Sequence, residues 1–251
     1  MLHLIHKLSQ FIIKTPFKVG MYAEIEKVGG LKNALNIEFN KIGSELKVST
    51  KSHFDKIPVT YARVEKDNKF SQIYIASQSK LYLPDFWRDG VCLAHGKTKN
   101  FNELAKVLDT WLNRDITIAE LCKEHSFVIA SHKSIAFDEG SEVGYTWELI
   151  QSDASKGELK EFVELAIKDE VLSKLFPFTS LNVLCFSRCT GYPYTRDTPA
   201  VIPVGKNTFQ VKLPSNVLVG NGTAAEALRM VKDNLPKGIK PAVKGTSDDL
   251  K

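Results

Sequence analysis

The feature that most constrains the fold is a series of short strand-like segments between residues 46 and 95. Polar clusters such as Lys66–Lys69 and Arg88–Gly90 separate these segments. Links of three to five residues between such runs are typical of β-hairpins. The pattern predicts an antiparallel meander of about five strands, at Leu46–Thr50, Val59–Glu65, Phe70–Ser77, Leu81–Phe86 and Val91–His95.

Helical patterns flank these strands. Before them, apolar residues recur on one helical face from Met21 until Gly29-Gly30 interrupts it, and a second short helix is expected after the break. After them, Asn100 with Glu103 and Thr117 with Glu120 are N-cap signatures. These helices are defined by apolar residues: Tyr22, Ile25, Val28, Leu31, Ala34, Leu35, Leu104, Leu108, Trp111, Leu112 and Leu121. One more helix is expected around Gly140–Ser152, from Val143, Trp147 and Ile150.

The second half of the chain repeats this order on a smaller scale. Gln151–Gly157 is small and polar, which is typical of a linker. An amphipathic helix is expected around Phe162, and Asp169 is placed to cap a second short helix that Pro177 would end. The alternation of Leu181–Thr190 predicts a strand that is covered on both faces.

A strand, strand, helix pattern occurs in both halves. The pairs are Leu81–Phe86 with Val91–His95, followed by a helix from Asn100, and Phe209–Leu213 with Val217–Val219, followed by a helix from Thr223. A helix that lies across a hairpin buries its apolar stripe on one sheet face, so a ββα unit used twice is physically reasonable. The alternative is that caps and stripes recur in unrelated units.

The predicted class is therefore α+β. An antiparallel β-meander with packed helices forms the N-terminal half, and a helix, a smaller antiparallel sheet and a C-terminal helix follow. The expected parts are an N-terminal extension (1–20), an N-terminal α+β region (21–152), a C-terminal α+β region (158–236) and a flexible tail (237–251).

Charge and composition exclude several classes of protein. The net charge of +5 is thin and scattered, whereas a nucleic-acid-binding protein usually shows a clustered basic patch. The four cysteines are too few and too widely spaced for a disulfide scaffold, and free thiols are typical of a reducing compartment. No apolar run approaches the length of a signal peptide core or of a membrane span. We therefore expect a cytoplasmic protein that binds neither nucleic acid nor membrane.

The sequence carries no motif for a known cofactor or metal. Phosphate-loop, dinucleotide, nucleophile-elbow and zinc-protease motifs are absent, and the six histidines are dispersed. We expect no cofactor and no metal site. For nucleophilic catalysis the best candidates are Cys185 or Cys189, with His95 or His132 as the base, although nothing in the sequence places a histidine beside either thiol.

Residues Leu175 to Asp197 are the densest group of chemically demanding side chains. A guanidinium at Arg188 needs a partner if it is buried, and a stiff turn follows at Gly191–Tyr194. Rigid backbone that carries Tyr and Arg suits a binding site, because little entropy is lost on contact. The candidate binding residues are Arg188, Tyr192, Tyr194, Arg196 and Asp197. The alternative is that Arg188 pairs with Asp197 in a folded corner, with the tyrosines as packing residues.

The same stretch resembles an uncharacterised bacterial family, common in actinomycetes, that is labelled "natural product biosynthesis protein". The likeness rests on LFPF-x-S followed by L-C-F-S-R-C-T-x-x-P-Y-x-x-D-x-P, and would extend over Met21 to Thr246. Many members carry a histidine where this chain has Leu181. Further matching pieces are Gly29-Gly30-Leu31, Asp85-Phe86-Trp87-x-x-Gly90-Val91, Leu235-Pro236 and Pro241-Ala242-x-x-Gly245-Thr246.

Two classes of function remain open from the sequence, beside a purely structural role for this stretch. The first is a non-catalytic protein-binding or accessory protein, for example an immunity partner encoded beside a toxin or biosynthetic cluster, with a partner from a neighbouring gene. The second is a small-molecule enzyme or accessory factor in natural-product biosynthesis, with its site around Cys185–Asp197. The sequence does not indicate an oligomeric state.

Overall fold

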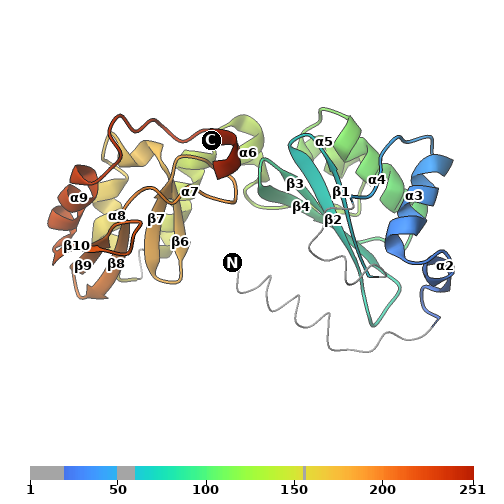
Figure 1. The fold of residues 1–251 in the computed structure, drawn as a ribbon, viewed down its shortest axis with the longest axis horizontal. Helices are drawn as coiled ribbons and strands as arrows, with labels where there is room; N and C mark the ends of the chain where they lie inside the picture. Colours follow the sequence, from blue (N-terminus) through green and yellow to red (C-terminus); the bar gives the residue numbers. More distant parts are fainter. Residues whose placement is uncertain (1–19, 50–59, 155–156) are drawn as a thin grey trace. The chain divides into compact units, whose positions relative to one another are not determined.

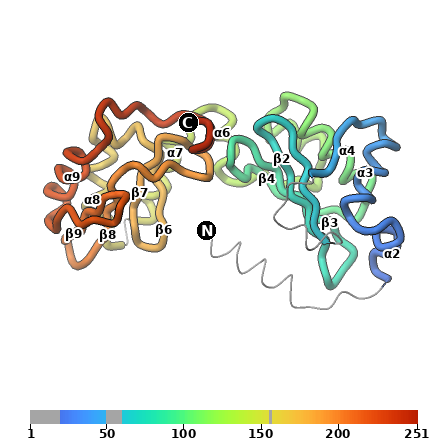
Figure 2. Tube along the Cα trace, viewed as in Figure 1, coloured from blue at the N-terminus to red at the C-terminus, as the bar shows by residue number. Residues whose placement is uncertain are grey.

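The computed structural model describes residues 20–49, 60–154 and 157–251, so all but the last residue of the expected extension (1–20) lies outside it. These residues form two compact units (Figures 1 and 2). The first contains the described residues up to Arg88 together with Cys92–Ser134. The second contains Asp89–Val91 together with the described residues from Ile135 to Lys251. Each unit has its own five-stranded sheet and helices, which confirms the predicted α+β class.

The sheet of the first unit is a meander in which the strands follow their order in the sequence. Its strands are β1 (Tyr61–Lys66), β2 (Lys69–Ile75), β3 (Tyr82–Arg88), β4 (Val91–Gly96) and β5 (Val128–Ala130). In the register, Tyr61 lies opposite Tyr74 and Ile73 lies opposite Pro84. The meander over β1 to β4 confirms four of the predicted strands.

The fifth strand differs from the prediction. Residues 46–49 of the expected strand Leu46–Thr50 do not form one, and Thr50 lies outside the described residues. Val48 makes only an isolated antiparallel bridge to Val64, because its N–H donates to the side chain of Asn36 at 2.9 Å. The fifth strand is β5, which pairs with β4.

Helices cover one face of this sheet. They are α2 (Ala23–Glu26), α3 (Leu31–Lys41), α4 (Phe101–Asn113) and α5 (Ile118–Glu124). The side chain of Asn100 accepts hydrogen bonds from the backbone N–H groups of Asn102 (3.0 Å) and Glu103 (3.3 Å), which confirms the predicted cap of α4. The apolar face of α4 packs on β1, β2 and β3, where the ring of Trp111 meets that of Phe86 edge to face at 6.2 Å.

The second unit contains a sheet in the order β10-β9-β8-β7-β6. Its strands are β6 (Phe176–Ser180), β7 (Val183–Ser187), β8 (Ala200–Gly205), β9 (Thr208–Lys212) and β10 (Leu218–Gly222). Pro177 is tolerated because β6 is an edge strand, where one side of the backbone needs no sheet partner.

The predicted strand Leu181–Thr190 is too long at both ends. Ser180 pairs with Val183, so Leu181 and Asn182 form a two-residue turn, with Leu181 at φ 56° and its side chain 93% exposed. Strand β7 then ends at Ser187, where the backbone turns away. Alternation alone did not reveal these two turns.

Helices α7 (Glu142–Ala154), α8 (Lys160–Ala166) and α9 (Ala224–Asp233) pack on the second sheet (Figure 1). Further helical elements are α6 (Ser134–Glu139) and the 3₁₀ turns η1 (Leu172–Lys174) and η2 (Ser247–Leu250). Trp147 of α7, Phe162 of α8 and Val231 of α9 meet Phe186 and Phe209 of the sheet in one buried cluster. Two consecutive strands followed by a capped helix thus occur in both units, as β3-β4-α4 and β9-β10-α9.

The parts expected from the sequence and the compact units have different boundaries. The expected linker Gln151–Gly157 begins within α7, and residues 155–156 are not described. The units instead divide between Ser134 and Ile135. The segment expected as a tail, 237–251, has backbone hydrogen bonds to the rest of the second unit and ends in η2.

Candidate functional site

The candidate site is built on the corner, which we define as Ser187–Thr198 between β7 and β8. Its centre is the buried hydroxyl of Ser187. The Ser187 Oγ donates to the carbonyl of Cys189 at 2.8 Å, and accepts from the N–H of Cys189 at 3.1 Å and that of Thr195 at 3.2 Å. One side chain therefore joins both arms of the corner.

Two threonines complete this network. The Oγ1 of Thr195 accepts from the backbone N–H of Arg188 at 2.9 Å. The Oγ1 of Thr198 donates to the carbonyl of Phe186 at 2.7 Å. Because buried polar groups are stable only when they are hydrogen-bonded, this network fixes the path of the backbone through the corner.

The C-terminal segment, residues 237–251, is hydrogen-bonded to the backbone of the corner. The N–H of Val243 donates to the carbonyl of Arg188, and the N–H of Thr190 donates back to the carbonyl of Val243, both at 3.0 Å. Further along, Gly191 N donates to Gly245 O at 2.7 Å. The segment is thus paired alongside the corner like a short parallel strand.

Arg188 and Asp197 form an ion pair across the corner. The Arg188 Nε donates to Asp197 Oδ2 at 2.7 Å, and Nη2 lies 2.6 Å from the same oxygen in an ion pair. The two side chains are 35% and 37% exposed. The pairing considered from the sequence is therefore present, but it leaves the guanidinium partly open to solvent.

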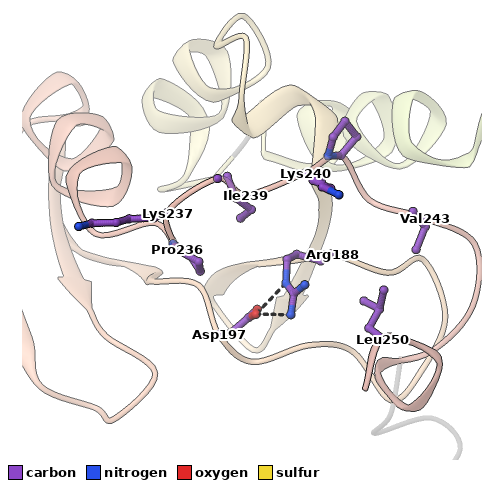
Figure 3. Close-up of a pocket in the computed structure, with 10 residues that line it drawn as sticks. Arg188, Asp197, Pro236, Lys237, Ile239, Lys240, Val243 and Leu250 are labelled. Carbon is purple, nitrogen blue, oxygen red and sulfur yellow. Dashed lines mark hydrogen bonds and ion pairs between the residues drawn. The ribbon is translucent and has the colours of Figure 1, made fainter.

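A cavity of about 490 Å³ opens beside this pair (Figure 3). In Figure 3, Arg188 lies in the middle, Pro236 and Ile239 lie on one side, and Val243 and Leu250 lie on the other. The lining residues are Arg188, Asp197, Pro236, Lys237, Gly238, Ile239, Lys240, Pro241, Val243 and Leu250. The cavity therefore combines one ion pair and two lysines with a wall of mostly apolar side chains.

The other three predicted site residues do not line this cavity. Tyr192 is 52% exposed and Arg196 is exposed. The ring of Tyr194 is half-buried and stacks on that of Phe178, with centroids 4.4 Å apart. Burial raises the pKa of Tyr194 to about 12, so its phenol is neutral near neutral pH. The five predicted residues thus divide into a cavity pair, two exposed side chains and one packing residue.

The thiols of this region do not have the surroundings of nucleophiles. Burial raises the pKa of Cys185, against a smaller lowering by the charge of Arg196. The Sγ of Cys189 lies 3.6 Å from the carbonyl oxygen of Gly191, to which it donates. His95 belongs to the first unit, where its Nε2 lies 3.6 Å from the Sγ of Cys92. Within residues 20–49, 60–154 and 157–251, no group of three His, Cys, Asp or Glu side chains is placed to hold a metal ion.

Sequence reasoning missed the contribution of the C-terminal segment to the site. Ile239, Val243 and Leu250 line the cavity, although the C-terminal α+β region was expected to end at residue 236. The matching pieces of the resemblance at Leu235-Pro236 and Pro241–Thr246 were the available signal, because they continue the likeness beyond the last helix.

The comparisons with known proteins concern this half of the chain. Residues 127–246 match the model of a family of unknown function (DUF6193), so this part is similar to that family. No curated protein and no solved structure matches the chain. None of the helices that the structure describes is both long and apolar enough to cross a membrane.

Proposed function

We propose that this chain is a non-catalytic protein-binding protein, and that the corner of the second unit is its contact site. The observation that carries the proposal is the combination of a fixed backbone with open side chains. The corner is hydrogen-bonded on both sides, yet Tyr192 and Arg196 are exposed and Arg188 lines a cavity.

This combination suits protein recognition for a physical reason. A flexible loop loses conformational entropy when it binds, whereas a loop that is already fixed loses little. Tyr and Arg are also the side chains that, with Trp, most often dominate the binding energy of protein interfaces. The thiols of the same region have raised pKa values or carbonyl neighbours, so the geometry favours binding over nucleophilic catalysis.

The resemblance to the family labelled "natural product biosynthesis protein" extends this proposal to the kind of partner. We propose an accessory or immunity protein whose partner is encoded by a neighbouring gene of a toxin or biosynthetic cluster. Such a partner would contact the exposed Tyr192 and Arg196 directly.

The test uses purified proteins. The product of each neighbouring gene is mixed with the full chain, and complex formation is measured by size-exclusion chromatography and titration calorimetry. Tyr192→Ala and Arg196→Ala should each weaken a complex by about tenfold or more, as expected for side chains in the centre of an interface. The matched control is Lys206→Ala, an exposed substitution in the β8–β9 turn. Absence of any complex, or equal effects of all three substitutions, would contradict the proposal.

A further inference from the structure

We propose that the cavity beside the corner binds a carboxylate that is attached to an apolar group, and that Asp197 positions Arg188 to receive it. This inference rests on the proposed function, because it names the part of a partner protein that would enter the cavity. That part is a chain end or an acidic side chain next to an apolar residue.

The first step of the argument is the geometry of the guanidinium. A guanidinium has five N–H groups in one plane. The Nε–H of Arg188 donates to Asp197 Oδ2, and Nη2 faces the same oxygen in an ion pair. Within the part of the chain that the structure describes, Arg188 Nη1 has no hydrogen-bond partner. The edge formed by Nη1 and the second N–H of Nη2 therefore remains available, and this edge matches the two oxygens of a carboxylate.

The second step is the charge of the cavity. The charges of Arg188 and Asp197 offset one another. Two further lining residues, Lys237 and Lys240, are positively charged, and in Figure 3 the side chain of Lys237 points away from Arg188. The net charge of the lining is therefore positive, which complements an anion such as a carboxylate.

The third step is the shape and polarity of the wall. Ile239 lies on one side of Arg188 in Figure 3, and Val243 and Leu250 lie on the other, so much of the cavity wall is apolar. Val243 is 47% exposed, so burial of its side chain by a ligand would be favourable. A volume of about 490 Å³ holds more than a carboxylate alone, and suits an amino-acid side chain together with its carboxylate.

Asp197 acts through Arg188 in this arrangement. Because it contacts both Nε and Nη2, it holds the plane of the guanidinium at one angle. A guanidinium fixed in advance loses less side-chain entropy when a ligand binds. Asp197 is therefore a positioning residue, and the ligand would contact Arg188.

The experiment titrates small probes into the full chain and follows binding by NMR. N-acetylleucine carries a terminal carboxylate and an apolar group, and N-acetyl-aspartyl-leucinamide carries a side-chain carboxylate with a blocked end. We expect at least one of the two to bind about tenfold more tightly than N-acetylleucinamide, which lacks the charge, and acetate, which lacks the apolar group. The preferred probe distinguishes a chain end from an acidic side chain.

Substitutions then locate the site. Arg188→Lys keeps the charge but loses the planar fork, and Val243→Glu places a negative charge at the mouth, so each should weaken binding about fivefold or more. Lys206→Ala is the matched control, because Lys206 is exposed in the β8–β9 turn and does not line the cavity, and it should change the dissociation constant less than about twofold at about 0.15 M salt. Asp197→Asn should weaken binding and also broaden or shift the Nε–H resonance of Arg188, while the backbone spectrum is preserved.

Several results would overturn the inference. They are equal binding of N-acetylleucine and its amide, equal or tighter binding of inorganic phosphate, no binding of either carboxylate probe, or insensitivity to both Arg188→Lys and Val243→Glu. If a protein complex forms and is unaffected by these two substitutions, the proposed function stands and the carboxylate site is wrong. If the probes bind but no neighbouring gene product does, the carboxylate site stands and the proposed function is wrong.

Discussion

Two aspartates show how the surroundings of a single residue determine its protonation. On the half-buried face of the first sheet, burial raises the pKa of Asp85 to about 7, although its Oδ1 accepts from the N–H of Gln72 at 2.7 Å. At Asp169, burial also acts to raise the pKa, but hydrogen bonds from Lys232 and from two backbone N–H groups outweigh it and lower the pKa below its usual range. The first carboxyl is thus a pH-sensitive group, and the second is a structural anion.

At the residue scale we expect Asp85 to make stability depend on pH. Its folded pKa lies above the value of about 3.9 for an unfolded chain, so the folded state holds more protons between pH 4 and 7, and the free energy of unfolding falls as pH rises through that window. Asp85→Asn should remove this slope and raise the free energy of unfolding at pH 8 by about 1–3 kcal/mol. Urea denaturation at pH 5 and pH 8 gives the free energy of unfolding of both proteins. If it changes by the same amount between the two pH values in the native protein and in Asp85→Asn, the expectation is contradicted.

Thiol reactivity is a second expectation at this scale. Because burial raises the pKa of Cys185, its thiolate fraction near neutral pH is small. Iodoacetamide should therefore label Cys185 at least about tenfold more slowly in the native protein at pH 7.5 than after unfolding in urea. Mass spectrometry of digested samples gives the rate for each cysteine. Rapid labelling of Cys185 or Cys189 in the native protein would contradict this expectation and favour the alternative of an enzyme with its site around Cys185–Asp197.

Individual residues of the site were only partly predictable. An arginine near a strand end demands a partner, so pairing of Arg188 with Asp197 was a reasonable alternative from the sequence. The central role of Ser187 was not predictable, because a serine hydroxyl fits many local hydrogen-bond patterns and its five contacts depend on the folded corner.

At the scale of elements, caps and apolar stripes were the reliable signals. The caps at Asn100 and Thr117 are present, because a cap needs only a few neighbouring residues. Asp169 accepts from the backbone N–H of Val171 as a cap would, but the expected helix is the 3₁₀ turn η1, whose N-cap is Val171, and Pro177 lies in β6. Strand ends were less predictable. The residues around Leu181 alternate like a strand, but pairing across β6 and β7 determines where the turn falls.

The turn between β6 and β7 allows one prediction at the scale of elements, which concerns the stability effect of Leu181. Leu181 has φ 56°, a conformation that glycine adopts without steric cost and leucine does not. Because its side chain is 93% exposed, little packing would be lost on replacement. Leu181→Gly should therefore raise the free energy of unfolding by about 0.5 kcal/mol. A loss of stability in thermal and urea denaturation would show that this backbone is not strained.

Asp169 supports a second test, since it connects two elements. Its Oδ1 accepts from the N–H groups of Val171 and Leu172, both at 3.0 Å, at the start of η1, and its Oδ2 pairs with Lys232 of α9 at 2.7 Å. Asp169→Ala should lower the free energy of unfolding by about 1–2 kcal/mol, as for other lost caps. Asp169→Asn retains a cap and should lower it less. Equal effects of the two substitutions would assign the stability to the ion pair.

At the scale of the whole molecule, the described part of the chain has two sheets and two compact units. The class was predictable because strand and helix patterns alternate along the sequence. The boundary between the units was not, because composition marks polar stretches such as Gln151–Gly157, whereas compactness depends on contacts between distant residues. Composition was misleading for the C-terminal segment as well, because its Pro, Gly and Lys content is typical of a free tail.

Because each unit has its own sheet and helices, we expect the two units to unfold in separate transitions. Asp85→Asn acts in the first unit and Asp169→Ala acts in the second. Scanning calorimetry at pH 8 should resolve two transitions, and each substitution should move only one of them, by about 2–8 °C per kcal/mol for units of this size. A single transition that both substitutions shift equally would show that the units unfold together.

The second unit also includes three residues that lie far upstream in the sequence. Asp89–Val91 lie between β3 and β4 in the sequence but group with this unit, and Gly90 O accepts from the N–H of Tyr192 at 3.1 Å. A stretch that begins at residue 127, where the family match starts, omits this contribution. A protein cut down to the matched stretch alone would therefore lack one backbone acceptor for its own corner, and truncation at residue 127 would leave the N–H of Tyr192 without this partner.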